Sequence, residues 1–202
     1  MAQQDAGHGV AGIVLAGGRS RRMGRDKAAL DWDGEPMLAR VVRVVGERCG
    51  PVFVVATEES AAYRSLYGSG GPEARWVTGE TPGTGPLGGL AVGLSTAAEA
   101  GAEWAFVCAT DMPLITPELI DELLRGVTPS TQAVIATDAQ RDHPMAGVYR
   151  TDAAGVIADL TAGGERRMLA ALDALTTHRV TVSNPEWLIN VNAPEDLHRL
   201  HA

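Results

Sequence analysis

The sequence is poor in cysteine: only Cys49 and Cys108 occur among its 202 residues. They stand far apart and form no C-x-x-C pair, which excludes the usual zinc-binding spacing and a disulfide framework. Long hydrophobic runs are also missing, because no stretch approaches the roughly 18 apolar residues that a transmembrane helix needs. The first residues lack the basic and apolar regions of a signal peptide. We therefore expect a cytoplasmic protein with no membrane partner, in which Cys108 is a buried thiol.

Positive charge is scarce as well. Seventeen Lys and Arg stand against 25 Asp and Glu, which gives a formal net charge of −8. A broad surface for nucleic acid needs clustered Lys and Arg, so the composition argues against a nucleic-acid partner. Hydrophobic residues make up 45% and charged residues 21%, which is the balance of a folded globular protein. The length suits a chain whose apolar residues are buried in a single core.

Apolar runs of strand length alternate with helical patterns along most of the chain. The apolar runs are continuous, as in strands buried on both faces, and they cover 10–16, 51–56, 104–109 and 132–136, with weaker candidates at 74–78, 145–150 and 178–182. Helical patterns cover 36–48, 87–99, 116–126, 152–161, 165–175 and 194–201. The alternation up to residue 126 predicts an α/β fold of three layers, a mostly parallel sheet with helices on both faces. We expect one domain over 1–202, whose last third adds a lobe.

The loop after the first strand is the most informative segment, because ligands of open α/β sheets bind beyond the carboxyl ends of the strands. Gly17 and Gly18 let the backbone approach a ligand closely, and four arginines and one lysine follow between residues 19 and 27. Successive amides together with Arg and Lys heads form a natural polyphosphate cradle. The spacing of Gly18, Gly24 and Lys27 is not that of a P-loop. The alternative is a solvated basic loop that binds nothing.

Residues 15–30 read Leu-Ala-Gly-Gly-Arg-Ser-Arg-Arg-Met-Gly-Arg-Asp-Lys-Ala-Ala-Leu. This run resembles, without a gap, the signature of the molybdenum cofactor guanylyltransferases, which belong to a superfamily of nucleotidyltransferases. Similar pieces follow in the family's order: Gly85-Pro-Leu-Gly-Gly-Leu90, Thr110-Asp-Met-Pro-Leu114, His143-Pro-Met-Ala-Gly-Val-Tyr149 and Asn190-Val-Asn-Ala-Pro-Glu-Asp-Leu197. The resemblance covers nearly the whole chain. It implies a Rossmann-like nucleotidyltransferase fold with a GTP-binding part at 10–126 and an acceptor-binding lobe at 130–200.

The resemblance also implies a nucleotide site. The backbone that would face guanine and ribose belongs to Leu15, Ala16 and Gly17. The residues that would hold the triphosphate are Gly18, Ser20, Arg22 and Lys27. The loop that would close over the base contains Gly85, Pro86 and Leu87. Arg22 and Lys27 would also stabilise the charge that develops on the phosphates during catalysis.

Gly17 carries the preference for GTP. Relatives that use CTP resemble this chain but have alanine at that position, and the missing methyl makes room for a purine. One methyl group is worth about 1–3 kcal/mol in such discrimination. The family also implies a carboxylate shortly before Gly85 that reads guanine. Because the nearest acid here is Glu80, either its side chain reads the base or the backbone does so alone.

A second glycine pattern supports an alternative from another class. Gly83–Gly88 satisfies G-x-G-x-x-G, and Glu103 follows at the distance of a ribose-binding acid, as in a dinucleotide-dependent oxidoreductase. That fingerprint should open the first βα turn and follow its strand directly. Here residues 78–82 intervene and Glu103 precedes its strand. The remaining alternatives are a related enzyme such as a molybdopterin cytidylyltransferase, which uses CTP or another NTP, and a non-catalytic nucleotide-binding protein.

Asp111 is the predicted ligand of Mg²⁺, since it comes directly after the strand at 104–109 and beside the expected phosphate cradle. Mg²⁺ prefers one or two carboxylates together with phosphate oxygens. The alternative role for Asp111 is a cap of the turn before Pro113. The resemblance places Asn190 or Asn192 at the metal or the second substrate, and Asn192 also fits the first position of a helix-capping box.

The implied reaction is nucleotidyl transfer from Mg·GTP to the terminal phosphate of molybdopterin or its molybdenum-loaded form, and pyrophosphate leaves. The acceptor is already an anion, so no protein nucleophile is required. The candidates for acceptor binding are His143, Arg166, Arg167, Asn190 and Asn192. Residues 163–167 resemble either an anion site at a helix N-terminus or a solvated helix start. Transient contacts with other cofactor-biosynthesis or acceptor proteins are also expected.

Overall fold

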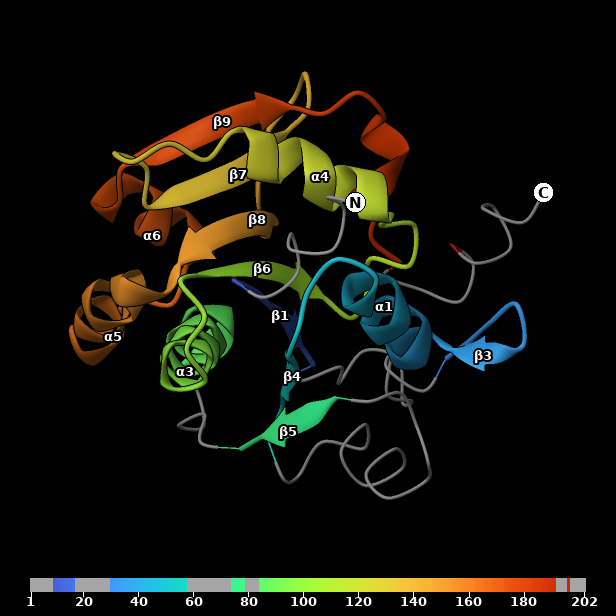
Figure 1. The fold of residues 1–202 in the computed structure, drawn as a ribbon, viewed down its shortest axis with the longest axis horizontal. Coiled ribbons are helices and arrows are strands. Elements are labelled where there is room, and N and C mark those ends of the chain that lie inside the picture. Colours follow the sequence, from blue (N-terminus) through green and yellow to red (C-terminus); the bar gives the residue numbers. More distant parts are fainter. Residues whose placement is uncertain (1–8, 17–29, 58–73, 79–83, 192–195, 197–202) are drawn as a thin grey trace, which may run out of the picture.

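A seven-stranded sheet forms the centre of the molecule (Figure 1). The structure is a computed structural model that describes residues 9–16, 30–57, 74–78, 84–191 and 196. The strands, in their order across the sheet, are β5 (Arg75–Val77), β4 (Val52–Val55), β1 (Val10–Leu15), β6 (Trp104–Ala109), β8 (Asp142–Arg150), β7 (Ala133–Thr137) and β9 (Thr177–Thr181). Every predicted strand is therefore present, and the α/β class is confirmed.

The sheet is parallel except around β8. Strands β5, β4, β1 and β6 run parallel, whereas β8 is antiparallel to both β6 and β7, and β9 is parallel to β7. The reversal follows from the short turn between Thr137 and Asp142, because a parallel neighbour needs a crossover of a dozen or more residues. Asp138 stabilises this turn: its Oδ1 accepts hydrogen bonds from the backbone N–H groups of Gln140 and Arg141. The strands of the last third of the chain, β7, β8 and β9, therefore belong to the same sheet as the earlier ones.

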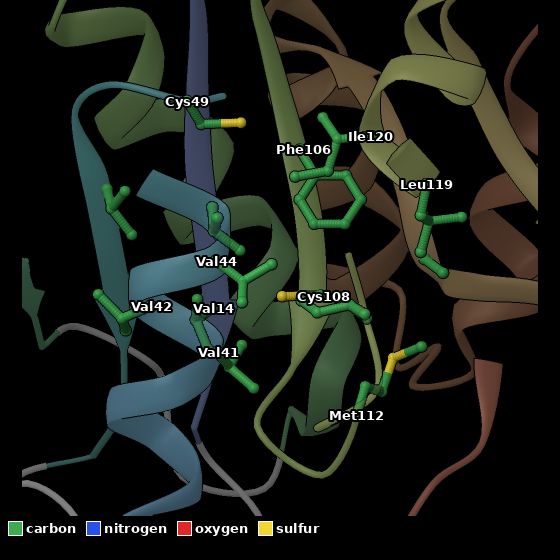
Figure 2. Packing of buried hydrophobic residues seen from close by; sticks show 14 of the residues in the cluster. Val14, Val41, Val42, Val44, Cys49, Phe106, Cys108, Met112, Leu119 and Ile120 are labelled. Atoms are coloured by element: carbon green, nitrogen blue, oxygen red, sulfur yellow. The ribbon is translucent and has the colours of Figure 1, made fainter. Parts of the chain in front are cut away.

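Helices cover both faces of the sheet (Figure 1). One face carries α1 (Met37–Gly46) and α4 (Pro117–Arg125); the other carries α3 (Gly85–Glu99), α5 (Ala154–Ala162) and α6 (Met168–Ala174). Figure 2 shows Val41 and Val44 of α1 packed near Val14, and Phe106 of β6 beside Ile120 of α4. Of the helices that the structure describes, none has the length and apolar character needed to cross a bilayer.

Both cysteines are buried free thiols, as the sequence predicts for Cys108. Burial raises the pKa of the Cys49 thiol to about 12 and raises that of Cys108 well above its ordinary value. A thiol reacts as its thiolate. Neither side chain is therefore a nucleophile at neutral pH.

Several element boundaries differ from the predicted ones. The predicted helix at 152–161 begins as a 3-10 turn, η2 (Thr151–Ala153), and the predicted helix at 165–175 begins only at Met168. Two further elements were not predicted: the hairpin of β2 (Asp31–Trp32) with β3 (Glu35–Pro36), and η3 (Pro185–Leu188). The hairpin turns at Asp33 and Gly34, whose φ angles are 51° and 87°, and this Asp-Gly pair suits a two-residue turn with both φ angles positive.

Gly12 of β1 packs closely against the end of α1. A methyl group built on Gly12 would overlap Cγ1 of the fully buried Val45 and lie 3.3 Å from Cβ of Cys49. We expect Gly12→Ala to lower the free energy of unfolding by about 1–3 kcal/mol, the usual cost of overpacking. Urea denaturation measures this change. The control is Gly155→Ala in α5, where no atom lies within 4 Å of the added methyl and alanine favours the helix; equal stability changes in both variants would contradict the prediction.

Candidate active site

The carboxyl ends of β1 and β6 meet at one edge of the sheet. Leu15 pairs with Ala109 in the parallel register, and both the backbone N–H and the hydroxyl of Thr110 donate to the Leu15 carbonyl, at 3.3 and 3.2 Å. Ala16, which leads into the glycine–arginine loop, is buried and bonded through its N–H to Val55. Ala16, the last described residue before that loop, therefore lies at the same edge of the sheet as Asp111, where the sequence predicts the phosphate cradle.

A distant segment joins the same edge. The N–H of Val191 donates to the Asp111 carbonyl at 2.8 Å, which brings Asn190 beside Asp111 although the two are far apart in sequence. Val191 is fully buried in a small cluster with Trp32 and Met37. The cluster anchors the segment, so the half-buried side chains of Asp111 and Asn190 come from adjacent pieces of backbone.

Asp111 and Asn190 suit a magnesium ion by the chemistry of their donors. Carboxylate and amide oxygens are hard ligands of the kind that Mg²⁺ prefers, and Mg²⁺ usually takes its other ligands from phosphates and water. Within the described ranges, no three His, Cys, Asp or Glu side chains gather into a metal-binding group. Because Mg²⁺ takes its other ligands from phosphates and water, an ion bound by Asp111 and Asn190 would be shared between the protein and a polyphosphate.

The first turn of α3 holds the residues predicted to close over the base. Gly85 has a φ of +69°, a conformation that favours glycine, and Pro86 occupies the first turn. The side chain of Leu87 is fully buried in the core. Since amides of the first helical turn have no partner within the helix, the predicted contact of Leu87 with the base would have to come from its backbone N–H.

The loop before α6 lies next to this turn. A methyl group built on Gly85 would lie 3.5 Å from the Arg166 carbonyl oxygen, so the exposed Arg166, predicted to bind the acceptor, lies beside the predicted base loop. Arg167 is bound differently: its side chain, 79% exposed, forms an ion pair of 2.8 Å with Glu165.

Glu165 lies where the sequence allows either an anion site or a solvated helix start. One carboxylate oxygen of Glu165 accepts the N–H groups of Arg166 and Arg167, at 2.8 and 2.9 Å. The hydrogen bonds from Arg167, followed by those from the backbone, lower the pKa of Glu165 to about 2. The start of this short helix is thus satisfied by the chain's own carboxylate, and the roles of Arg166 and Arg167 toward the acceptor stay predictions.

His143 lies at the same edge of the sheet, at the start of β8. The antiparallel register pairs Cys108 with Ala146, which carries His143 alongside the residues that follow β6. Its side chain is 8% exposed, and Nε2 lies 2.7 Å from Oδ2 of Asp138. This bond, together with two backbone N–H groups, lowers the pKa of Asp138 to about 2. The imidazole is therefore held in one orientation by the β7–β8 turn.

The Asp138 carboxylate gives a prediction for acid stability. Since its pKa is lower in the folded protein than in the unfolded chain, its stabilising contribution is complete above about pH 4 and is lost as the pH falls toward 2. We expect Asp138→Asn to be less stable than the parent protein at pH 7, with a flatter loss of stability between pH 4 and 2. Urea titrations at several pH values measure both.

The control for this prediction is Asp159→Asn, which removes an exposed carboxylate of α5. It should keep the pH dependence of the parent protein. Glu165, whose pKa is also about 2, adds the same pH-dependent stability to the parent and to both variants. A variant at Asp138 with the parent's pH dependence would contradict the assignment.

Seven predicted site residues lie outside the residues that the structure describes: Gly17, Gly18, Ser20, Arg22, Lys27, Glu80 and Asn192. Their assigned roles stay predictions. Sequence reasoning also missed one contributor, the hairpin at residues 31–36, whose Trp32 packs with Leu114 and Val191 beneath the site. The Asp33-Gly34 pair was the signal that indicated it.

Comparison with known proteins bears on the whole chain. The family model of the MobA-like NTP transferase domain matches residues 12–177. A Mycobacterium avium protein named "Probable molybdenum cofactor guanylyltransferase" is 45% identical over 195 residues, which cover 95% of this chain and 94% of that protein. The Mycobacterium marinum protein of the same name is 44% identical over 194 residues, 93% of this chain and 91% of its own.

Solved structures agree in fold. Molybdopterin-guanine dinucleotide biosynthesis protein A from Archaeoglobus fulgidus superposes with a TM-score of 0.75 at 24% identity, covering 94% of this chain and 95% of its own. A nucleotidyl transferase from Methanothermobacter superposes with a TM-score of 0.75 at 20% identity, covering 96% of each chain. At these identities the two structures support the three-layer architecture and the mixed sheet.

Proposed function

Because the chain belongs to the family of MobA-like NTP transferase domains, we propose that it transfers GMP from Mg·GTP to the terminal phosphate of molybdopterin or the molybdenum cofactor. Pyrophosphate leaves, and the product is the guanine dinucleotide form of the cofactor. One structural observation carries the proposal: backbone hydrogen bonds from Thr110 to Leu15 and from Val191 to Asp111 bring the end of β1, Asp111 and Asn190 to a single edge of the sheet. This is the edge where open α/β sheets bind their ligands.

The reaction needs alignment and charge neutralisation more than a reactive side chain. An oxygen of the acceptor phosphate forms a bond to the α-phosphorus of GTP, and the bond from that phosphorus to the bridging oxygen of the β-phosphate breaks. The residues of this chain that would hold the metal are Asp111 and Asn190, and those that would hold the phosphates are Arg22 and Lys27. A bound Mg²⁺ supplies positive charge worth several kcal/mol to the phosphates in the transition state. Fixing the two reactants in line supplies much of the rest.

The two parts of the chain divide the substrates between them in this proposal. Residues 10–126 bind the nucleotide, and residues 130–200 contribute His143, Arg166, Arg167, Asn190 and Asn192 toward the acceptor. The location of Arg166 beside Gly85 supports this division, since an acceptor has to reach the α-phosphate next to the base loop. Cytoplasmic location and transient protein partners stay predictions from the sequence.

The oxidoreductase alternative loses its support in the structure. Glu103 lies just before β6 and therefore at the amino end of the sheet, opposite Asp111. Its carbonyl accepts a hydrogen bond from Thr151. A ribose-binding acid has to end its strand at the carboxyl edge, so Glu103 cannot complete the Gly83–Gly88 fingerprint.

Calorimetry with Mg·GTP, Mg·CTP, Mg·ATP and NADH at fixed salt tests the proposal first, followed by pyrophosphate release with molybdopterin. We expect GTP to bind most tightly and to be consumed only when the acceptor is present. Preference for CTP would keep the reaction type but overturn the guanylyl assignment. Binding of nucleotide without pyrophosphate release would favour the non-catalytic alternative.

A further inference from the structure

The loop that carries Asp111 is tied down at three points. Thr110 donates to Leu15, and the Asp111 carbonyl accepts from Val191. The third tie comes from α1: Nε of Arg40 donates to the Pro113 carbonyl oxygen at 2.7 Å. This contact joins the helix to the loop across 73 positions in sequence, and no predicted role accounts for it.

The Arg40 guanidinium is itself held in place by the hairpin next to it. Its carbon lies 6.0 Å from the centroid of the Trp32 ring, within the range of a cation–π contact. Its Nη1 lies 4.0 Å from Oε1 of Glu35. Trp32 is 3% exposed and the Arg40 side chain 26%, so the ring is a fixed platform. A short bond from a charged donor is stronger than one between neutral groups.

We propose that Arg40 is a positioning residue, which holds the Pro113 carbonyl so that the Asp111 carboxylate is aligned for the metal–nucleotide complex. The inference rests on the proposed function, because it takes Asp111 as the metal ligand. Residues 110–116 form no helix or strand. Isolated backbone bonds hold the loop at Thr110, Met112 and Ile115, and the Arg40 side chain adds a tie at Pro113. Mg²⁺ demands near-ideal octahedral geometry, and a ligand displaced by about 0.5 Å is poorly placed.

A matched pair of variants separates the hydrogen bond from the charge. Arg40→Gln puts an amide nitrogen, and Arg40→Met a methyl group, where arginine has Nε. Both variants remove the positive charge, but only the glutamine retains a donor for the Pro113 carbonyl. Arg43→Met is the control for the neighbouring contact, since Arg43 bonds Glu35 at 2.9 Å from the same helix and does not reach the loop.

The readout is the affinity of the protein–GTP complex for Mn²⁺, measured by the loss of the free-ion electron paramagnetic resonance signal. We expect Arg40→Met to weaken Mn²⁺ binding about tenfold, the lower end of the range for groups that orient metal ligands. Arg40→Gln and Arg43→Met should stay close to the parent protein. Loss of a positive charge by itself favours a cation, so weaker Mn²⁺ binding has the opposite sign from a purely electrostatic effect.

GTP binding in EDTA completes the test. We expect it to be unchanged in Arg40→Met, because the residue acts through Asp111. Equal losses with and without metal would overturn the proposal in favour of a direct contact between Arg40 and the nucleotide. Equal Mn²⁺ affinities in all variants would overturn it as well. If Arg40→Met failed to fold while Arg40→Gln folded, the hydrogen bond would serve the fold as a whole, and the proposal would also be overturned. A parent protein whose GTP binding ignores Mn²⁺ would instead refute the metal site of the proposed function.

Discussion

Replacing Asp111 with asparagine is expected to lower the rate of pyrophosphate release by roughly 10²–10⁴-fold, the equivalent of the several kcal/mol that a bound metal contributes to phosphoryl chemistry. Asparagine keeps the size of the side chain and removes its charge. The backbone bonds of the loop, from Thr110 to Leu15 and from Val191 to the Asp111 carbonyl, do not involve the carboxylate and should persist. The loss would therefore come from the metal and not from the fold.

Nucleotide affinity separates this prediction from a general loss of structure. The arginines and lysine of residues 19–27 lie in another segment, so we expect Asp111→Asn to retain metal-independent GTP binding. Asp121→Asn is the matched control. Asp121 lies in α4, its Oδ1 forms an ion pair of 2.9 Å with Nε of Arg48, and it has no part in the proposed site. Steady-state rates at saturating GTP measure the effect. An Asp111→Asn protein within tenfold of the Asp121→Asn rate would refute the metal-ligand assignment.

The sheet could be predicted from the sequence because its strands are buried on both faces. Val52–Val55 and Trp104–Ala109 are continuous apolar runs, and such runs have few alternatives in a chain of this length. The hairpin at residues 31–36 was not predicted, because strands of two residues are too short to show a hydrophobic periodicity. The short connection between β7 and β8 can be recognised in the sequence, and it makes β8 antiparallel. The pairing register of the two strands cannot, because it shifts at an irregularity between Ile135 and Ala136.

The site was predictable where it depends on strand ends and unpredictable where it depends on tertiary contacts. Asp111 follows a buried strand, so its place at the carboxyl edge could be inferred. Its neighbour Asn190 could be named only from the family resemblance, because the backbone bond at Val191 that brings it to this edge has no local signature. From the sequence, Arg40 is indistinguishable from an ordinary surface residue of an amphipathic helix. Its hydrogen-bond acceptor is the backbone carbonyl of Pro113, which no sequence pattern reveals.

The first turn of α3 gives the second large effect. A methyl group built on Gly88 would overlap the hydroxyl of Thr84 and lie 2.5 Å from its Cβ. Because Cβ is fixed to the backbone, a change of rotamer cannot relieve the overlap, and the chain at Thr84 and Gly85 has to move. We expect Gly88→Ala to weaken GTP binding at least about tenfold, roughly 1.4 kcal/mol, as the predicted base loop shifts.

Two glycines of α3 should show opposite patterns, in that Gly88→Ala loses GTP affinity and Gly93→Ala loses stability. Alanine in place of a helical glycine is favourable by about 1 kcal/mol, which offsets part of the strain in Gly88→Ala, so its unfolding free energy should change little. Gly93→Ala faces the core, where the methyl would lie 2.7 Å from Cγ2 of Ile13. That variant should lose stability and keep its GTP affinity. Calorimetry and urea denaturation on both proteins test this crossover, and parent-like GTP binding by Gly88→Ala would show that the start of α3 does not contact the nucleotide.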